Sequence, residues 1–163
     1  MKKFIRLLTS KNSGGKAGPD PADYYNELAV DVLARTIWGE ARGEGLAGME
    51  AVASVVLNRV AVAQDRGGYW WGNDIISVCQ KPYQFSCWNR SDPNYRMLLD
   101  VTEKNIHFAT SLRIARRAIA GVLSDGTGRA THYHERSILP SWAQGQTPVA
   151  VINHHIFYKL IEV

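Results

Sequence analysis

The sequence predicts an α+β domain that is mainly helical and carries a small β element. In three stretches, at about residues 27–41, 46–63 and 108–123, apolar residues recur with the spacing of an amphipathic helix. After Gly128 the pattern becomes extended, at residues 130–134, 149–152 and 155–158. We therefore expect a helical body with a small two-stranded element packed against it.

The length and composition fit one domain. With 163 residues, 45% of them hydrophobic, the chain can bury a real core but is too short to divide into two domains. We expect a flexible basic leader over residues 1–22, followed by a single domain over residues 23–163. The apolar run near the start is shorter than the ~7–15 residues of a secretory signal. The net charge of +4 favours an anionic partner, and no nucleic-acid-binding motif accompanies it.

Residues 65–94, between the second and third predicted helices, form a long irregular stretch rich in aromatic residues. Aromatic rings stack on the C–H faces of sugars, and amides such as Gln84 and Asn89 bond hydroxyl and acetamido groups. The stretch therefore predicts sugar binding, with simple packing against the core as the alternative. Cys79 and Cys87 either close a disulfide here or pack as two small buried groups.

Glu40 is the candidate acid/base. It lies in IWGEARGE, residues 37–44, near the end of the first predicted helix and at the edge of its apolar face. Partial removal from water and the negative end of the helix dipole both favour the protonated form of a carboxylate there. A general acid in glycoside cleavage needs this tuning. A surface glutamate on an amphipathic helix is the commoner interpretation, and position alone does not overturn it.

Other side chains offer further chemistry. Glu44 is either a second catalytic carboxylate or a charge that favours the start of the second helix, and we favour the structural role. His132 and His134 share one face of a predicted strand, as in zinc peptidases, but no further ligands stand at an obvious spacing. A cysteine nucleophile paired with one of these histidines is weaker, because neither cysteine clearly begins a helix.

Three ordered blocks of sequence resemble a known family. The first, residues 34–60, matches A-x-x-I-x-x-E-A-R-G-E followed by G-x-x-A-V-A-x-V-x-L-N-R. The second is KPYQFSCWN at residues 81–89, and the third combines ATHYH at 130–134 with PVAVINHHIFY at 148–158. Together they resemble the SleB-type cell-wall hydrolases, named for the spore-cortex-lytic enzymes, over about residues 28–158.

The resemblance implies a lysozyme-like α+β fold that cleaves peptidoglycan between N-acetylmuramic acid and N-acetylglucosamine, without metal or cofactor. The reaction would be that of a lytic transglycosylase or a muramidase. The family's general acid/base corresponds to Glu40, and a lytic transglycosylase needs no second carboxylate because the muramoyl 6-hydroxyl replaces water. Candidates for lining the cleft are Gln84, Phe85, Tyr133 and His134.

One departure from the family is Asn153, where relatives often carry glycine, so the local turn is expected to differ. A short basic chain of this type resembles a phage or prophage endolysin. We expect a monomer that is made in the host cytoplasm and acts on peptidoglycan in the periplasm, without stable membrane insertion. The rivals are a zinc-dependent amidase or endopeptidase using His132 and His134, and a non-catalytic wall-binding module.

Overall fold

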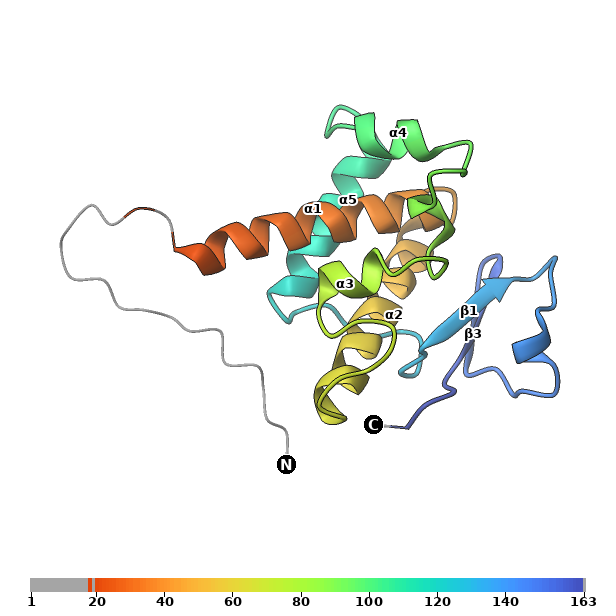
Figure 1. Cartoon of the computed structure of the whole chain (residues 1–163). Coiled ribbons are helices and arrows are strands. Elements are labelled where there is room, and N and C mark those ends of the chain that lie inside the picture. Colours follow the sequence, from red (N-terminus) through yellow and green to blue (C-terminus); the bar gives the residue numbers. More distant parts are fainter. Residues whose placement is uncertain (1–17, 19, 163) are drawn as a thin grey trace.

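A helical body and a small sheet lie side by side in the computed structural model, which describes residues 18 and 20–162 (Figure 1). The helices are α1 (Pro21–Ala41), α2 (Gly45–Asp65), α3 (Ile75–Cys79), α4 (Tyr95–Asp100) and α5 (Ile106–Ile119). Two 3-10 turns are η1 (Ser86–Trp88) and η2 (Ser141–Ala143), and the strands are β1 (His132–Glu135), β2 (Ala150–Ile152) and β3 (His155–Tyr158). The expected class, mainly helical α+β, is confirmed.

Helix α1 begins earlier than its apolar periodicity predicted. The Asp20 side chain accepts a hydrogen bond from the Ala22 N–H at 2.9 Å, which caps the helix. Pro21 follows in the first turn, where its missing N–H costs nothing. The helix therefore starts inside the segment expected to be a leader, and most of that segment lies outside the described residues.

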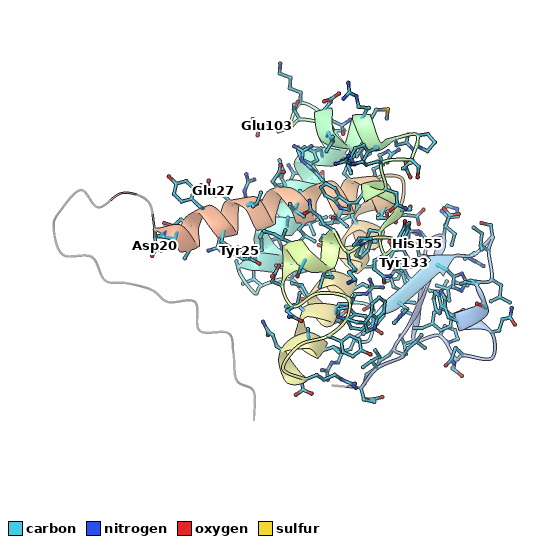
Figure 2. The ribbon with its side chains drawn as sticks, viewed as in Figure 1. Asp20, Tyr25, Glu27, Glu103, Tyr133 and His155 are labelled. Carbon is cyan, nitrogen blue, oxygen red and sulfur yellow. The ribbon has the colours of Figure 1, made fainter. Side chains whose placement is uncertain are left out.

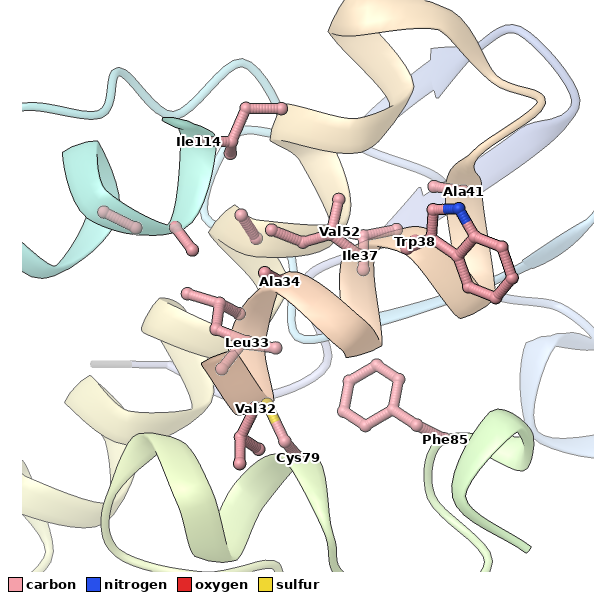
Figure 3. Close-up of a cluster of buried hydrophobic side chains, with 14 of the residues drawn as sticks. Val32, Leu33, Ala34, Ile37, Trp38, Ala41, Val52, Cys79, Phe85 and Ile114 are labelled. Carbon is pink, nitrogen blue, oxygen red and sulfur yellow. The ribbon is translucent and has the colours of Figure 1, made fainter. Parts of the chain in front are cut away.

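Helix α2 is the central core helix and matches its predicted range closely. By length and composition it could cross a membrane, as buried core helices also can, and 67% of its apolar window is buried inside the protein. Figure 3 shows Val52 of α2 in one cluster with Leu33 and Ile37 of α1 and Ile114 of α5. Burial of this cluster, in proportion to its apolar area, is the main contribution that holds the three helices together.

Helix α5 is shifted toward the N-terminus relative to its prediction. It begins at Ile106 because the Asn105 side chain accepts hydrogen bonds from the N–H groups of His107 and Phe108. It ends at Ile119, short of residue 123, because the chain turns at Gly121 with a φ of 74°.

The stretch over residues 65–94 contains more regular structure than expected. Helix α3 is closed by a capping box, in which Asp74 and Ser77 bond each other's backbone N–H groups. Both cysteines are buried free thiols, so of the two alternatives left open by the sequence, packing without a disulfide describes them. Cys79 lies beside Thr36, and Cys87 packs against Gly39 of the same helix, α1.

The sheet has three antiparallel strands in the order β1-β3-β2, rather than the two expected. Tyr133 on β1 and Ala150 on β2 both pair with Phe157 of the central strand. The extra edge strand arises because a tight turn at Asn153 folds β2 back on β3. Asn153 has a φ of 51°, the left-handed conformation that glycine favours and that asparagine adopts more readily than most residues.

Candidate active site

Glu40 lies in the last turn of α1, where the helical body meets the sheet. Its carboxylate Oε1 accepts a hydrogen bond from the Cys87 backbone N–H at 3.1 Å, and Oε2 accepts one from the Tyr133 hydroxyl at 3.0 Å. Within residues 20–162, no lysine, arginine or histidine forms an ion pair with it. Two neutral donors, one on each oxygen, therefore hold a half-buried carboxylate.

Tyr133 supplies its hydroxyl from the face of β1 that meets the helices. Burial, and then the negative charge of Glu40, raise the pKa of this hydroxyl well above its usual value, so it stays protonated. Its ring lies 4.9 Å from the His155 ring and 5.6 Å from the Phe157 ring, centroid to centroid. Figure 2 shows Tyr133 and His155 together at the junction with the helical body. Burial lowers the pKa of His155, which favours the neutral imidazole.

Helix α2 fixes the backbone that leads into β1. Asn58 donates to the carbonyl of Ala130 at 2.9 Å, and Arg59 donates from Nε to the carbonyl of Thr131 at 2.8 Å. The buried guanidinium of Arg59 lies 5.2 Å from the centroid of the Phe85 ring, a cation–π distance. These contacts place Tyr133, two residues further along the chain, opposite Glu40. Arg59 was not among the site residues predicted from the sequence.

Turn η1 carries the other donor and packs closely on α1. A Cβ atom at Gly39 would lie 2.6 Å from the Cβ of Cys87, so only glycine allows this approach. Trp88 fastens the same turn by donating from Nε1 to the Thr36 hydroxyl at 2.9 Å. The Cys87 N–H is thus held at Glu40 by contacts on both sides. Because the donor is a backbone group, side-chain patterns carried no signal for it.

Glu44 has a different environment from Glu40. Its carboxylate accepts the His154 backbone N–H at 2.9 Å and lies 3.1 Å from Nδ1 of the same residue. Its own carbonyl accepts a hydrogen bond from the Asn153 side chain. Partial burial alone would raise the pKa of Glu44, but the hydrogen bonds from His154 outweigh it and lower the pKa. These contacts fasten the β2–β3 turn to the α1–α2 joint, in line with the structural role.

The four residues predicted to line the cleft occupy different environments in the structure. Tyr133 bonds Glu40, whereas Phe85 is only 2% exposed and supports the Tyr133 ring from the core instead of offering a surface. Gln84 is half-buried and its Oε1 lies 3.5 Å from Nη1 of Arg59. His134 occupies the opposite face of β1, where its ring stacks on Tyr158 at 5.4 Å. Successive side chains on a strand alternate between faces, so Tyr133 and His134 cannot both face Glu40.

The geometry gives little support to a zinc site or to a cysteine nucleophile. Across the described part of the chain, no three side chains of the kinds that bind metals come together in a cluster. His132 lies 2.9 Å from the Thr131 hydroxyl, and burial, followed by the charge of Arg59, lowers its pKa to about 4. Burial raises the pKa of Cys79 to about 12 and that of Cys87 still further, which disfavours the thiolate that a nucleophile needs.

Comparisons with known proteins agree with this architecture. The catalytic domain of the Bacillus cereus SleB protein matches with a TM-score of 0.63 and 27% identity, covering 82% of this chain and 91% of that one. The catalytic domain of the germination-specific lytic transglycosylase SleB from Bacillus anthracis gives 0.61 and 27%, covering 80% and 93%. The lysozyme-like α+β fold expected from the sequence resemblance is confirmed.

Sequence relatives point the same way. The spore cortex-lytic enzyme of Bacillus cereus is 28% identical over 160 residues, which cover 91% of this chain and 54% of the relative. That of Halalkalibacterium halodurans is 30% identical over 136 residues, covering 82% and 35%. The chain thus spans about half or less of these relatives' length. Residues 43–158 match the model of the cell wall hydrolase family, beginning just after Glu40. The chain belongs to the cell wall hydrolase family.

Proposed function

We propose that this chain cleaves the glycan strands of bacterial peptidoglycan between N-acetylmuramic acid and N-acetylglucosamine, with Glu40 as the single acid/base. The observation that carries the proposal is the Glu40 carboxylate, held between the Cys87 N–H and the Tyr133 hydroxyl where the helices meet the sheet. The names of the relatives, spore cortex-lytic enzyme and lytic transglycosylase, support this substrate class.

The chemistry needs one carboxylate. Protonated Glu40 gives its proton to the glycosidic oxygen, the bond from that oxygen to C1 of the muramoyl unit breaks, and the glucosamine-ended strand leaves as an alcohol. The muramoyl 6-hydroxyl then attacks C1 while the Glu40 carboxylate takes its proton. This closes a 1,6-anhydro ring, restores the acid and consumes no water. Glu44 is not required, and its oxygens already bond His154.

The two donors suit a group that changes protonation state twice per turnover. After the first transfer, the Cys87 N–H and the Tyr133 O–H stabilise the new carboxylate by direct hydrogen bonds. A hydroxyl can also accept a hydrogen bond, so Tyr133 remains a partner when Glu40 is protonated. Neither donor carries a positive charge that would hold Glu40 in its ionised form.

Hydrolysis by water at the same carboxylate, the muramidase reaction, is the second candidate for this site. Mass spectrometry of digested, purified sacculi distinguishes the candidates, and we expect anhydro-muropeptides. Reducing-end muropeptides would indicate the muramidase, freed peptides an amidase, and intact wall a binding module. Sacculi incubated in parallel with a Glu40→Gln variant should release no muropeptides. EDTA should leave the reaction of the wild type unchanged. We place the reaction at the cell wall, outside the inner membrane.

A further inference from the structure

We propose that a hollow formed by residues 80–91 is a subsite for the peptide-bearing side of the muramoyl unit, an inference that rests on the proposed function. The hollow has a volume of about 390 Å³. Its lining includes Lys81, Pro82, Tyr83, Trp88, Asn89 and Arg90.

The hollow is connected to the proposed acid through one of its walls, although Glu40 itself does not line it. Trp88, which forms one wall, directly follows Cys87, whose N–H donates to Glu40. The Trp88 indole is tied to Thr36, and Thr36 lies one turn before Glu40 on the same face of α1, a rise of about 6 Å. A sugar substituent bound in the hollow would therefore belong to a unit next to the bond that Glu40 cleaves.

The charge of the hollow favours an anion. Lys81 and Arg90 line it, and no aspartate or glutamate does. Throughout residues 20–162, neither cation forms an ion pair with a carboxylate. A larger hollow of about 640 Å³ between α1 and α5 has mixed charge. It is lined by the acidic residues Glu27, Asp31 and Glu103 and by the basic residues Arg35 and Arg116. In Figure 2, Glu27 and Glu103 lie well away from Tyr133.

Tyr83 has a strained backbone conformation, and burial of its side chain does not offset that strain. The Lys81 carbonyl accepts the Gln84 N–H at 3.1 Å, which closes a turn with Pro82 second and Tyr83 third. Tyr83 has a φ of 65°, at a turn position where positive φ favours glycine, and its side chain is 87% exposed. Burial therefore does not compensate the backbone strain. Strain of this kind is found at ligand-binding sites, and an exposed rigid ring provides a stacking surface.

The muramoyl unit carries a substituent that matches these features. It differs from the glucosamine unit by a 3-O-lactyl group, to which a short peptide with free carboxylates is attached. The Tyr83 and Trp88 rings can contact the sugar face and the methyl groups of this substituent. Lys81 and Arg90 can pair with the peptide carboxylates. Recognition of the peptide would make cleavage faster on peptide-bearing strands than on bare glycan.

The test compares kcat/KM on soluble, uncrosslinked peptidoglycan strands before and after an amidase has removed their peptides. Stripped strands keep only the lactyl carboxylate. We expect the wild type to prefer peptide-bearing strands, and Lys81→Gln/Arg90→Gln to lose that preference by about fivefold, as for two exposed ion pairs. The loss on stripped strands should be smaller than the loss on peptide-bearing strands. Both activities of the charge-matched control Lys104→Gln/Arg113→Gln should stay within about twofold. Equal losses on both substrates would overturn the proposal.

A Tyr83→Gly variant separates binding from folding. Glycine relieves the positive φ, so we expect thermal stability to stay level or rise while the preference for peptide-bearing strands falls. A fall in stability, with equal loss on both substrates, would indicate a structural residue and contradict the subsite.

Binding measured without turnover keeps the subsite and the proposed function apart. In a Glu40→Gln background, we expect the protein to bind immobilised, uncrosslinked peptide-bearing strands and to bind the same strands less tightly after amidase treatment. Adding Lys81→Gln and Arg90→Gln should abolish that difference. If the wild type cuts neither substrate but the difference in binding is present, the proposed function fails and the subsite stands. If cleavage occurs without any peptide preference in cleavage or binding, the subsite alone fails.

Discussion

The last turn of α1 and the joint that follows it each present one glutamate to the sheet, and the two are held in different ways. Glu40 accepts hydrogen bonds from a backbone N–H and a phenolic hydroxyl, on segments 47 and 93 residues away. Glu44 accepts both of its carboxylate bonds from His154, and its carbonyl bonds the neighbouring Asn153. One glutamate thus faces two separate elements, while the other fastens a single turn.

The difference suggests what separates an acid/base from a fastening carboxylate. The His154 contacts favour the ionised form of Glu44 and lower its pKa, which suits a permanent hydrogen-bond acceptor. Glu40 has neutral hydrogen-bond donors, which suit a group that gives and retakes a proton. We therefore expect changes at the first glutamate to alter activity and changes at the second to alter stability.

The largest expected effect comes from exchanging the two carboxylates for amides. Glu40→Gln removes the proposed proton donor, so cleavage of sacculi should fall by about 10²–10⁴-fold, with the melting temperature almost unchanged. Glu44→Gln, the matched control, should keep activity within about threefold and lower stability instead. Turbidity clearing and thermal unfolding measure both quantities on the same samples. Comparable loss of activity in the two variants would remove the distinction and make Glu44 a second catalytic carboxylate.

Next in size are alanine substitutions at the two glycines beside these glutamates. At Gly39 a Cβ would lie 2.6 Å from the Cβ of Cys87, and at Gly48 it would lie 2.4 Å from the Cβ of Glu44. Each clash should cost about 1–3 kcal/mol of unfolding free energy in urea titrations. Gly39→Ala should also reduce activity, because it displaces the turn that supplies a donor to Glu40.

The control for this pair is Gly43→Ala, since a Cβ there meets no atom within 4 Å. It should leave both stability and activity near the wild-type values. If Gly39→Ala and Gly48→Ala reduced activity by the same factor, the two glutamates would not differ in the way proposed.

The parts that sequence predicted are those that depend on local pattern. Apolar periodicity located three helices, and the motif around Glu40 selected the residue that we propose as the acid. The same periodicity also indicates that Arg59 is buried, because it lies one turn after Val56 on the buried face of α2. An arginine on such a face indicates a buried polar contact, here the one with Thr131.

The parts that sequence missed depend on long-range geometry or on the backbone. The Glu40–Tyr133 bond spans 93 residues, and no local pattern states which strand face meets which helix end. Strand alternation did limit the choice, because Tyr133 and His134 are neighbours and point to opposite faces. The Cys87 donor is a backbone N–H, which any residue would supply, so it depends on how closely η1 approaches Gly39.

A smaller effect is expected from removing one hydroxyl at Glu40. Tyr133→Phe deletes a single neutral hydrogen bond to the carboxylate, so activity should fall by about tenfold. Tyr158→Phe is the matched control, because its hydroxyl lies 3.0 Å from the His134 ring on the other face of the sheet. Steady-state rates on solubilised strands compare the two. Equal rates for Tyr133→Phe and the wild type would show that the hydroxyl is only structural.

The smallest effect concerns the pH dependence of stability at Glu44. Folding lowers the pKa of this carboxyl from its ordinary value of 4.5, so the folded state binds fewer protons than the unfolded state at acidic pH. Its contribution to stability is therefore complete above pH 4.5 and is lost as the pH falls through the folded pKa. Because His154 is largely exposed, the contribution should be only about 0.5 kcal/mol. Urea unfolding of the wild type and Glu44→Gln should differ by this amount at pH 6 and converge toward pH 3. A difference that does not change with pH would mean that Glu44 acts through packing rather than charge.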